Sequence, residues 1–211
     1  MSKEPSQSNH PLILHYLTQI RDKNTPAHEF RNSVHRLATL LAMDVLGDLS
    51  VEDIPVETPM ETTAGHRLNQ RVGLVPIMRA GLGLVEPILQ LIPEAEVWHL
   101  GLYRDEQTLE PVEYYQKLPA DQAVDIAIVL DPMLATGGSA IAALEALTRW
   151  GVKKTKFMGI LAAPEGIAAV REAFPETDLH VCRIDSHLND IGYIVPGLGD
   201  AGDRIFNATA E

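Results

Sequence analysis

The stretch from residue 126 to 139, which reads I-A-I-V-L-D-P-M-L-A-T-G-G-S, constrains the fold of this chain more than any other. Its first five residues are apolar and partly β-branched, which is typical of a strand buried on both faces. Asp131 marks the end of that strand. Hydroxyls and glycines at 136–139 precede an apolar-periodic helix, so backbone N–H groups can converge at the helix N-terminus. The pattern predicts a strand–loop–helix unit that can cradle a phosphate; the alternative is an ordinary turn capped by Thr136 or Ser139.

The acid beside this loop narrows the kind of ligand that we expect. A carboxylate at position 131 would repel a bare phosphate. It suits a ligand that also offers sugar hydroxyls or a bound Mg²⁺, because carboxylate oxygens accept hydrogen bonds and bind hard cations. The loop therefore predicts a sugar phosphate ligand.

Length and charge limit the other classes of protein. A chain of 211 residues with 45% hydrophobic content can bury one substantial core, so we expect a single domain over residues 1–211 with a flexible tail at 1–9. Seventeen basic against twenty-nine acidic residues give a formal net charge of −12, which disfavours nucleic acid as a partner. No run of about eighteen apolar residues could span a membrane. With no signal peptide pattern either, we expect a cytoplasmic protein with no membrane partner.

Cysteine and histidine do not point to a reactive or metal site. Cys182 is the one cysteine, which excludes an internal disulfide, and we expect a buried, inert thiol in an apolar strand at 179–184. The eight histidines lack the spacing of metal ligands.

Apolar periodicity predicts alternating strands and helices. Two N-terminal helices are expected at 12–20 and 26–47, and residues 54–60, which contain two prolines, should form an extended arm that pairs with the segment near His66. This alternation is typical of an α/β fold with a mainly parallel central sheet flanked by helices, and with ligands at the carboxyl ends of the strands. The strands are predicted at 72–78, 96–103, 126–130, 155–163 and 179–184, and the further helices at 84–91, after 139, and at 165–174.

One further segment is a candidate for anion binding, and another is a candidate flap. Arg79 follows the strand at 72–78 and precedes Gly81 and Gly83, and a guanidinium on a glycine-rich turn suits bidentate phosphate binding. The alternative is a surface arginine in a tight turn. Residues 104–119 are polar and contain two prolines, so we expect an extended flap, which by composition alone is a solvated loop.

A glycine-rich segment near the C-terminus reads Y-I-V-P-G-L-G-D-A-G-D-R over residues 193–204. Its glycines spell G-x-G-x-x-G, but only nine residues follow Gly202, which leaves no room for the helix and strand of a dinucleotide-binding unit. Such a segment can instead wrap around a small planar ligand and read its edge with backbone groups, while Asp200 reaches a hydroxyl or a metal-bound water.

Three of these loops and the flap resemble, in order, those of the uracil phosphoribosyltransferases, a family of type I phosphoribosyltransferases. The 131–139 motif resembles the binding motif for 5-phosphoribosyl-1-pyrophosphate (PRPP), with Pro132 where most of the superfamily carries a second acid. The resemblance implies catalytic roles for Arg79, Arg104, Asp131 and Asp200. It implies PRPP binding by Arg79, Arg104, Asp131, Pro132, Met133, Leu134, Ala135, Thr136, Gly137, Gly138, Ser139 and Asp200, and uracil binding by Tyr193, Ile194, Gly199, Asp200 and Ala201.

The same resemblance implies a reaction and its partners. Uracil and PRPP would give uridine 5′-monophosphate (UMP) and pyrophosphate, a step of pyrimidine salvage, with Mg²⁺ held through PRPP and water near Asp200. It also implies a homodimer or homotetramer, and some bacterial members are activated by GTP. No residue stands out as a general base. The segment 207–211 departs from the usual family ending.

Two rival functions stay open on the sequence. A phosphoribosyltransferase for another nucleobase would share the PRPP loops and differ at 193–202. A PRPP-sensing regulator of nucleic acid on the same fold would not catalyse the reaction, and it would need a basic face, which the net charge of −12 disfavours.

Overall fold

A computed structural model describes residues 4–104, 111–116 and 122–208. Its centre is a seven-stranded sheet in the order β1-β11-β10-β8-β4-β5, with β9 pairing to β10, and every pairing in it is parallel. The strands are β1 (Ser6–Gln7), β4 (Val72–Pro76), β5 (Glu96–Val97), β8 (Ile126–Leu130), β9 (Met133–Leu134), β10 (Lys154–Ala162) and β11 (Asp178–Ile184). The helices are α1 (Pro11–Arg21), α2 (Ala27–Leu46), α3 (Val85–Leu89), α4 (Gly138–Trp150), α5 (Pro164–Ala173) and α6 (Ala201–Phe206), with a 3-10 turn η1 (Ala80–Leu84).

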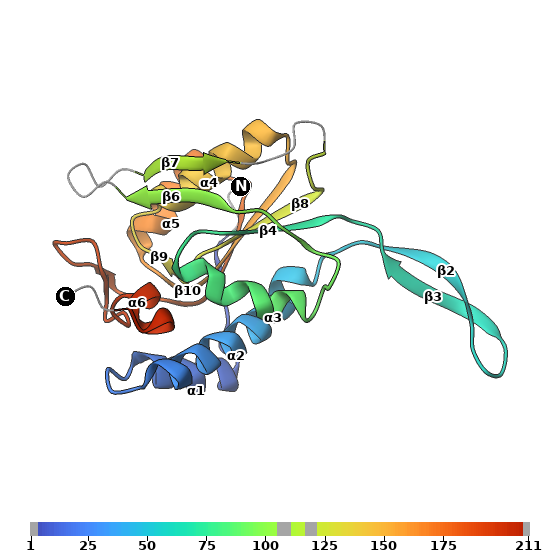
Figure 1. Cartoon of the computed structure of the whole chain (residues 1–211), viewed down its shortest axis with the longest axis horizontal. Coiled ribbons are helices and arrows are strands. Elements are labelled where there is room, and N and C mark those ends of the chain that lie inside the picture. The colour runs from blue at the N-terminus through green and yellow to red at the C-terminus, as the bar shows by residue number, and fades with distance from the viewer. Residues whose placement is uncertain (1–3, 105–110, 117–121, 209–211) are drawn as a thin grey trace.

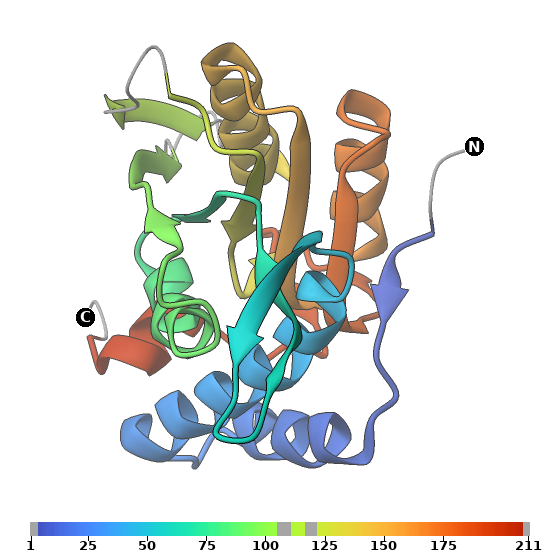
Figure 2. The same cartoon turned by 90° about the vertical axis from the view of Figure 1, so that its right-hand side faces the viewer.

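Helices cover both faces of the sheet, as Figures 1 and 2 show. Every residue of β8 is fully buried, because alternate side chains of a strand enter opposite cores. Ile128 and its neighbours two residues away pack in the core that α1, α2 and α3 cover, whereas Ala127 and Val129 pack in the core under α4 and α5. Replacing Ile128 by alanine would cost about 2–5 kcal/mol of folding free energy.

The segments that follow β4 and β8 lie side by side at the carboxyl edge of the sheet. Pro76 and Leu130 are partners in the last register pair of the two strands. The turn η1 then passes so close to β8 that a Cβ at Gly81 would lie 2.2 Å from the carbonyl oxygen of Leu130. Glycine at 81 therefore allows the two loops to leave the sheet next to each other.

The predicted α/β architecture is confirmed, and most predicted strands and helices lie within one to three residues of their observed bounds. The single strand predicted at 96–103 is wrong. Only β5 joins the central sheet, while β6 (Leu100–Arg104) pairs antiparallel with β7 (Pro111–Gln116) in a separate hairpin. This hairpin includes Arg104 and residues 111–116 of the predicted flap, and the rest of the flap lies outside the described residues.

The N-terminal segment also differs from the expected flexible tail. Ser6 and Gln7 pair in parallel with His180 and Val181 at the outer edge of the sheet. The side chain of Gln7 adds a contact, since its Oε1 accepts a hydrogen bond of 2.9 Å from the N–H of Ile184. This pairing uses backbone groups and no apolar side chains, so the polar composition of the segment does not indicate it.

The predicted arm is a two-stranded hairpin that extends away from the body of the protein (Figure 1). Its strands β2 (Val51–Glu57) and β3 (Thr62–Leu68) pair over their whole length, with Asp53 opposite His66. Nearly all of its side chains are exposed or half-buried, including Met60 at the tip with 92% exposure.

Two expectations about chemistry can be compared with the structure. Cys182 is buried in β11, and burial raises the pKa of its thiol to about 12, which fits an inert side chain. Among the described residues, no helix is both long and apolar enough to cross a membrane.

Candidate active site

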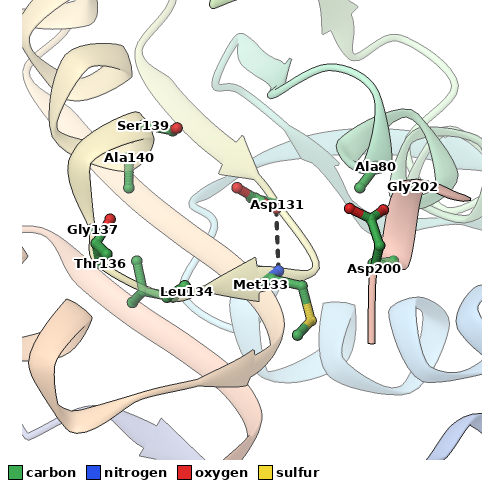
Figure 3. Close-up of a pocket in the computed structure, with 12 residues that line it drawn as sticks. Ala80, Asp131, Met133, Leu134, Thr136, Gly137, Ser139, Ala140, Asp200 and Gly202 are labelled. Carbon is green, nitrogen blue, oxygen red and sulfur yellow. Dashed lines mark hydrogen bonds between the residues drawn. The ribbon is translucent and has the colours of Figure 1, made fainter. Parts of the chain in front are cut away.

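A cavity of about 230 Å³ opens at the carboxyl edge of the sheet, where the loops after β4 and β8 meet the start of α6. The loop at residues 131–139 forms one wall, and Ala80 with residues 200–202 forms the other (Figure 3). We call the first segment the 131–139 loop. Residues 200–202 belong to the glycine-rich C-terminal segment, which we call the 193–202 loop. The lining residues are Ala80, Asp131, Met133, Leu134, Ala135, Thr136, Gly137, Ser139, Ala140, Asp200, Ala201 and Gly202.

The 131–139 loop is held tightly against α5. Gly137, which has a φ of +87°, directly precedes α4, and a Cβ at this position would lie 3.0 Å from the carbonyl oxygen of Gly166. Gly166 in turn approaches so closely that a Cβ there would lie 2.3 Å from the carbonyl oxygen of Ala135. The N-terminus of α4 therefore begins at the cavity wall, where its first N–H groups can bind an anion.

Asp131 sits directly after β8 and lines the cavity. Its Oδ1 accepts a hydrogen bond of 3.1 Å from the N–H of Met133, which folds the side chain back over the loop (Figure 3). The pKa of this carboxyl is raised to about 7: burial is the main cause, the Met133 hydrogen bond opposes it, and the negative charge of Asp200 adds to it. The group therefore changes its charge near neutral pH, unlike an ordinary aspartate.

Asp200 comes from the other wall and caps α6. Its Oδ1 accepts a hydrogen bond of 2.8 Å from the N–H of Asp203, as an N-cap side chain does. Figure 3 shows Asp131 and Asp200 on two different segments beside the same opening. Two carboxylates so placed can accept hydroxyl donors or share a divalent cation that a ligand brings.

Arg79 lies just outside this lining. It follows β4 and precedes η1, and its side chain is more than half exposed. Its Nη2 donates a hydrogen bond of 2.8 Å to Asp203 Oδ1, in the first turn of α6. The sequence reasoning missed Asp203; its spacing of three residues from Asp200, across the start of a helix, is the signal that could have revealed it.

The structure brings only some of the predicted site residues to the cavity. Most residues of the 131–139 loop line it, together with Asp200 and Ala201. Tyr193, Ile194 and Gly199 lie earlier in the 193–202 loop and are not among the lining residues. Pro132 is buried, and its carbonyl oxygen accepts hydrogen bonds of 2.9 Å from Ile160 and Leu161. Pro132 therefore ties the loop to β10.

Arg104 and a possible metal site are the remaining predicted features. The backbone of Arg104 ends β6, where it pairs with Pro111, and its side chain lies outside what the structure describes. Within the described ranges, no group of three or more histidine, cysteine, aspartate or glutamate side chains could hold a metal ion.

Comparison with solved structures identifies the class to which this fold belongs. The chain is similar to the AQ2163 protein from Aquifex aeolicus, with a TM-score of 0.92, 38% identity, and coverage of 99% of this chain and 100% of the other. A hypoxanthine-guanine phosphoribosyltransferase from Bacillus anthracis shares the fold at a TM-score of 0.51 and 10% identity, over 75% and 80% of the two chains. The sheet, its flanking helices and the loop after β8 thus define a type I phosphoribosyltransferase fold.

Sequence comparison identifies the family within this class. The family model for uracil phosphoribosyltransferase matches residues 7–208. Curated uracil phosphoribosyltransferases from Roseiflexus castenholzii and Geobacillus kaustophilus are each 54% identical over 94% of this chain, which covers 96% and 95% of their lengths. The chain belongs to the uracil phosphoribosyltransferase family.

Proposed function

We propose that this protein transfers the 5-phosphoribosyl group from PRPP to N1 of uracil, giving UMP and pyrophosphate in pyrimidine salvage. The observation that carries the proposal is a family match over residues 7–208 in a chain whose sheet-edge cavity is lined by the family's PRPP motif. In the reaction, the bond from C1 of the ribose to the pyrophosphate oxygen breaks and a bond from C1 to N1 forms. N1 of uracil loses its proton, and no described residue is assigned as the base that takes it.

The 131–139 loop is proposed to hold the phosphoribosyl end of PRPP. The backbone of residues 135–139 at the start of α4 binds the 5′-phosphate, because unsatisfied N–H groups and the helix dipole favour an anion there. Asp131 accepts hydrogen bonds from ribose hydroxyls. When ionised, it also stabilises the positive charge that builds on the sugar ring as pyrophosphate leaves.

Arg79 and Arg104 are proposed to bind the pyrophosphate, each through a guanidinium that can donate two parallel hydrogen bonds to phosphate oxygens. Mg²⁺ held through PRPP would neutralise part of the leaving charge. The cavity fits such an ion, since Asp131 and Asp200 present carboxylates on its two sides. Asp200 would orient the hydrated ion or a ribose hydroxyl.

The 193–202 loop is proposed to bind the base through the backbone of Ile194, Gly199 and Ala201, with Tyr193 near the ribose. Uracil presents an acceptor, a donor and an acceptor along one edge, and peptide groups can complement all three. Cytosine would leave buried peptide groups unpaired, which is a strong form of discrimination.

We further propose that the protein is a homodimer or homotetramer and that the β2–β3 arm contributes to the contact. Nearly all side chains of the arm are in solvent, Met60 among them, and an isolated two-stranded hairpin of this kind is only marginally stable in water. Analytical ultracentrifugation of the full chain and of a variant that lacks residues 58–61 would test this. Activation by GTP and a cytoplasmic location stay predictions.

Formation of UMP from uracil and PRPP, measured with and without Mg²⁺, tests the proposed function. We expect turnover of uracil that depends on Mg²⁺, and at least about a hundredfold lower turnover of cytosine and purines. Turnover of another base in place of uracil would instead support a phosphoribosyltransferase for that base. Absence of turnover together with RNA or DNA binding would support the regulator.

A further inference from the structure

The 193–202 loop is tied to an ion pair whose two members come from distant parts of the chain. Arg21, the last residue of α1, donates from Nη1 to Asp185 Oδ2 at 2.9 Å and from Nη2 to Asp185 Oδ1 at 2.6 Å. Asp185 directly follows β11, and its side chain is only 4% exposed. A bidentate, charge-assisted pair of this kind is both strong and directional, and losing one partner would leave the other charge buried.

Both members of the pair also bind the backbone of Gly197. Arg21 Nη1 donates to the Gly197 carbonyl oxygen at 2.8 Å, and the Gly197 N–H donates to Asp185 Oδ2 at 3.0 Å. Gly197 has a φ of +61°, and a Cβ there would lie 2.0 Å from the carbonyl oxygen of Ile194. The ion pair therefore fixes both polar groups of a residue that must be glycine.

A second arginine holds the next residue of the loop. Arg204 Nη1 donates to the carbonyl oxygen of Leu198 at 2.8 Å, and its Nη2 donates to the carbonyl oxygen of Asp22 at 2.6 Å. Its guanidinium lies over the Phe30 ring, 4.2 Å from the ring centroid. Side chains thus bind residues 197 and 198 of the loop.

Gly199 follows immediately and differs from its two neighbours. It has a φ of +81°, and within the described part of the chain no side chain donates a hydrogen bond to it or accepts one from it. Its peptide groups are therefore available to a ligand, while the residues before it are fixed and Asp200 after it caps α6.

We propose that Arg21 and Asp185 are positioning residues for the base in the proposed reaction, on which this inference rests. They act through the loop: they hold residue 197 so that the backbone groups of Gly199 and Ala201 stand at fixed positions when uracil arrives. Recognition by backbone hydrogen bonds needs this precision, because a displacement of about 1 Å is enough to weaken them. Without the ion pair, the loop would become ordered only when uracil binds, and the entropy lost in that step would lower the affinity for uracil.

The test is the effect of Arg21→Met on the two Michaelis constants of the full-length protein. Methionine keeps the apolar stem and removes the guanidinium. We expect KM for uracil to rise about tenfold, while KM for PRPP stays within about twofold, because only the base loop loses its support. Arg21→Lys, which keeps the charge but not the fork geometry, should raise KM for uracil less than Arg21→Met does.

Asp185→Asn gives an independent reading if Arg21→Met fails to fold. Asparagine keeps the shape and one acceptor for the Gly197 N–H, and removes the charge, so KM for uracil should again rise selectively. Arg71→Met is the matched control. Arg71 forms a more exposed ion pair with Glu96 at 2.8 Å, away from the cavity lining, and its loss should change neither KM.

Unchanged KM for uracil in both folded variants, or equal rises in both constants, would overturn the inference and leave these residues a purely structural role. That outcome is distinct from failure of the proposed function, in which the wild-type protein itself forms no UMP from uracil and PRPP.

Discussion

The two loops that meet at the cavity are built in different ways. The 131–139 loop connects β8 to α4, so the sheet and the helix position its backbone directly. The 193–202 loop contains only the two-residue strand β13 (Ile194–Val195), which pairs with β12 (His187–Leu188) outside the central sheet. Its position depends on side chains, with Arg21 lying 176 residues away from Gly197 along the chain.

With the roles proposed above, this difference would separate two recognition tasks. A helix N-terminus offers several N–H groups to any phosphate. A preceding strand and a glycine turn are enough to position that N-terminus. Reading the edge of a base needs a few backbone groups at defined positions, and a loop without regular structure obtains them from charged side chains that bind its peptides. We therefore expect changes in the first loop to alter PRPP handling, and changes behind the second to alter uracil handling.

The largest effect is expected for Asp131→Asn. Asparagine keeps the acceptor for the Met133 N–H but removes the negative charge beside the sugar ring, so kcat/KM for PRPP should fall by about a hundredfold to a thousandfold. Steady-state kinetics with both substrates checks this, and circular dichroism should show an unchanged fold. Wild-type rates would remove Asp131 from the reaction, and a matching loss in uracil affinity would show that the two loops do not work separately.

Arg79→Ala should give the next largest effect. A charge-assisted hydrogen bond contributes about 1.5–3 kcal/mol, so KM for PRPP should rise roughly tenfold to a hundredfold while KM for uracil changes little. Arg71→Ala, which removes another partly exposed arginine, is the control. A variant with unaltered PRPP kinetics would contradict the pyrophosphate role of Arg79.

The same difference between the loops decides what sequence reasoning can predict. Five apolar residues, an acid and two glycines lie within residues 126–138, so the strand, the loop and its ligand class can be inferred from local pattern. The ion pair of Arg21 with Asp185 joins positions 164 residues apart, and no local pattern marks it. The edge pairing of β1 and the break between β5 and β6 were missed for the same reason, since backbone pairing partners set both.

The pH dependence of kcat/KM for PRPP should show a smaller effect than these substitutions. Burial raises the pKa of Asp131 from its ordinary value near 3.8 to about 7, so the carboxylate gains a proton as pH falls through 7. We expect kcat/KM for PRPP to fall by up to about tenfold per pH unit below this point, and the fall to be absent in Asp131→Asn. A profile that is flat between pH 6 and 8 in the wild type would contradict this assignment.

The raised pKa also has a consequence for stability. The folded protein keeps a proton on Asp131 that the unfolded chain has already released, so ionisation destabilises the fold progressively as pH rises from about 4 to about 7. The melting temperature of Asp131→Asn minus that of the wild type should therefore be larger at pH 8 than at pH 4. An equal difference at both pH values would mean that Asp131 titrates normally.

The smallest effect, and the most direct test of separation, is expected for Asp203→Asn. Asp203 belongs to α6, which continues the 193–202 loop, yet its carboxylate binds Arg79, in the turn after β4, at 2.8 Å. A partly exposed pair of this kind contributes about 0.2–1 kcal/mol, so KM for PRPP should rise no more than about fivefold. The cap from Asp200 uses the backbone N–H of residue 203 and survives the substitution. KM for uracil should therefore stay constant; if it rises in step with KM for PRPP, α6 transmits the state of Arg79 to the base loop, and the two loops form one coupled site.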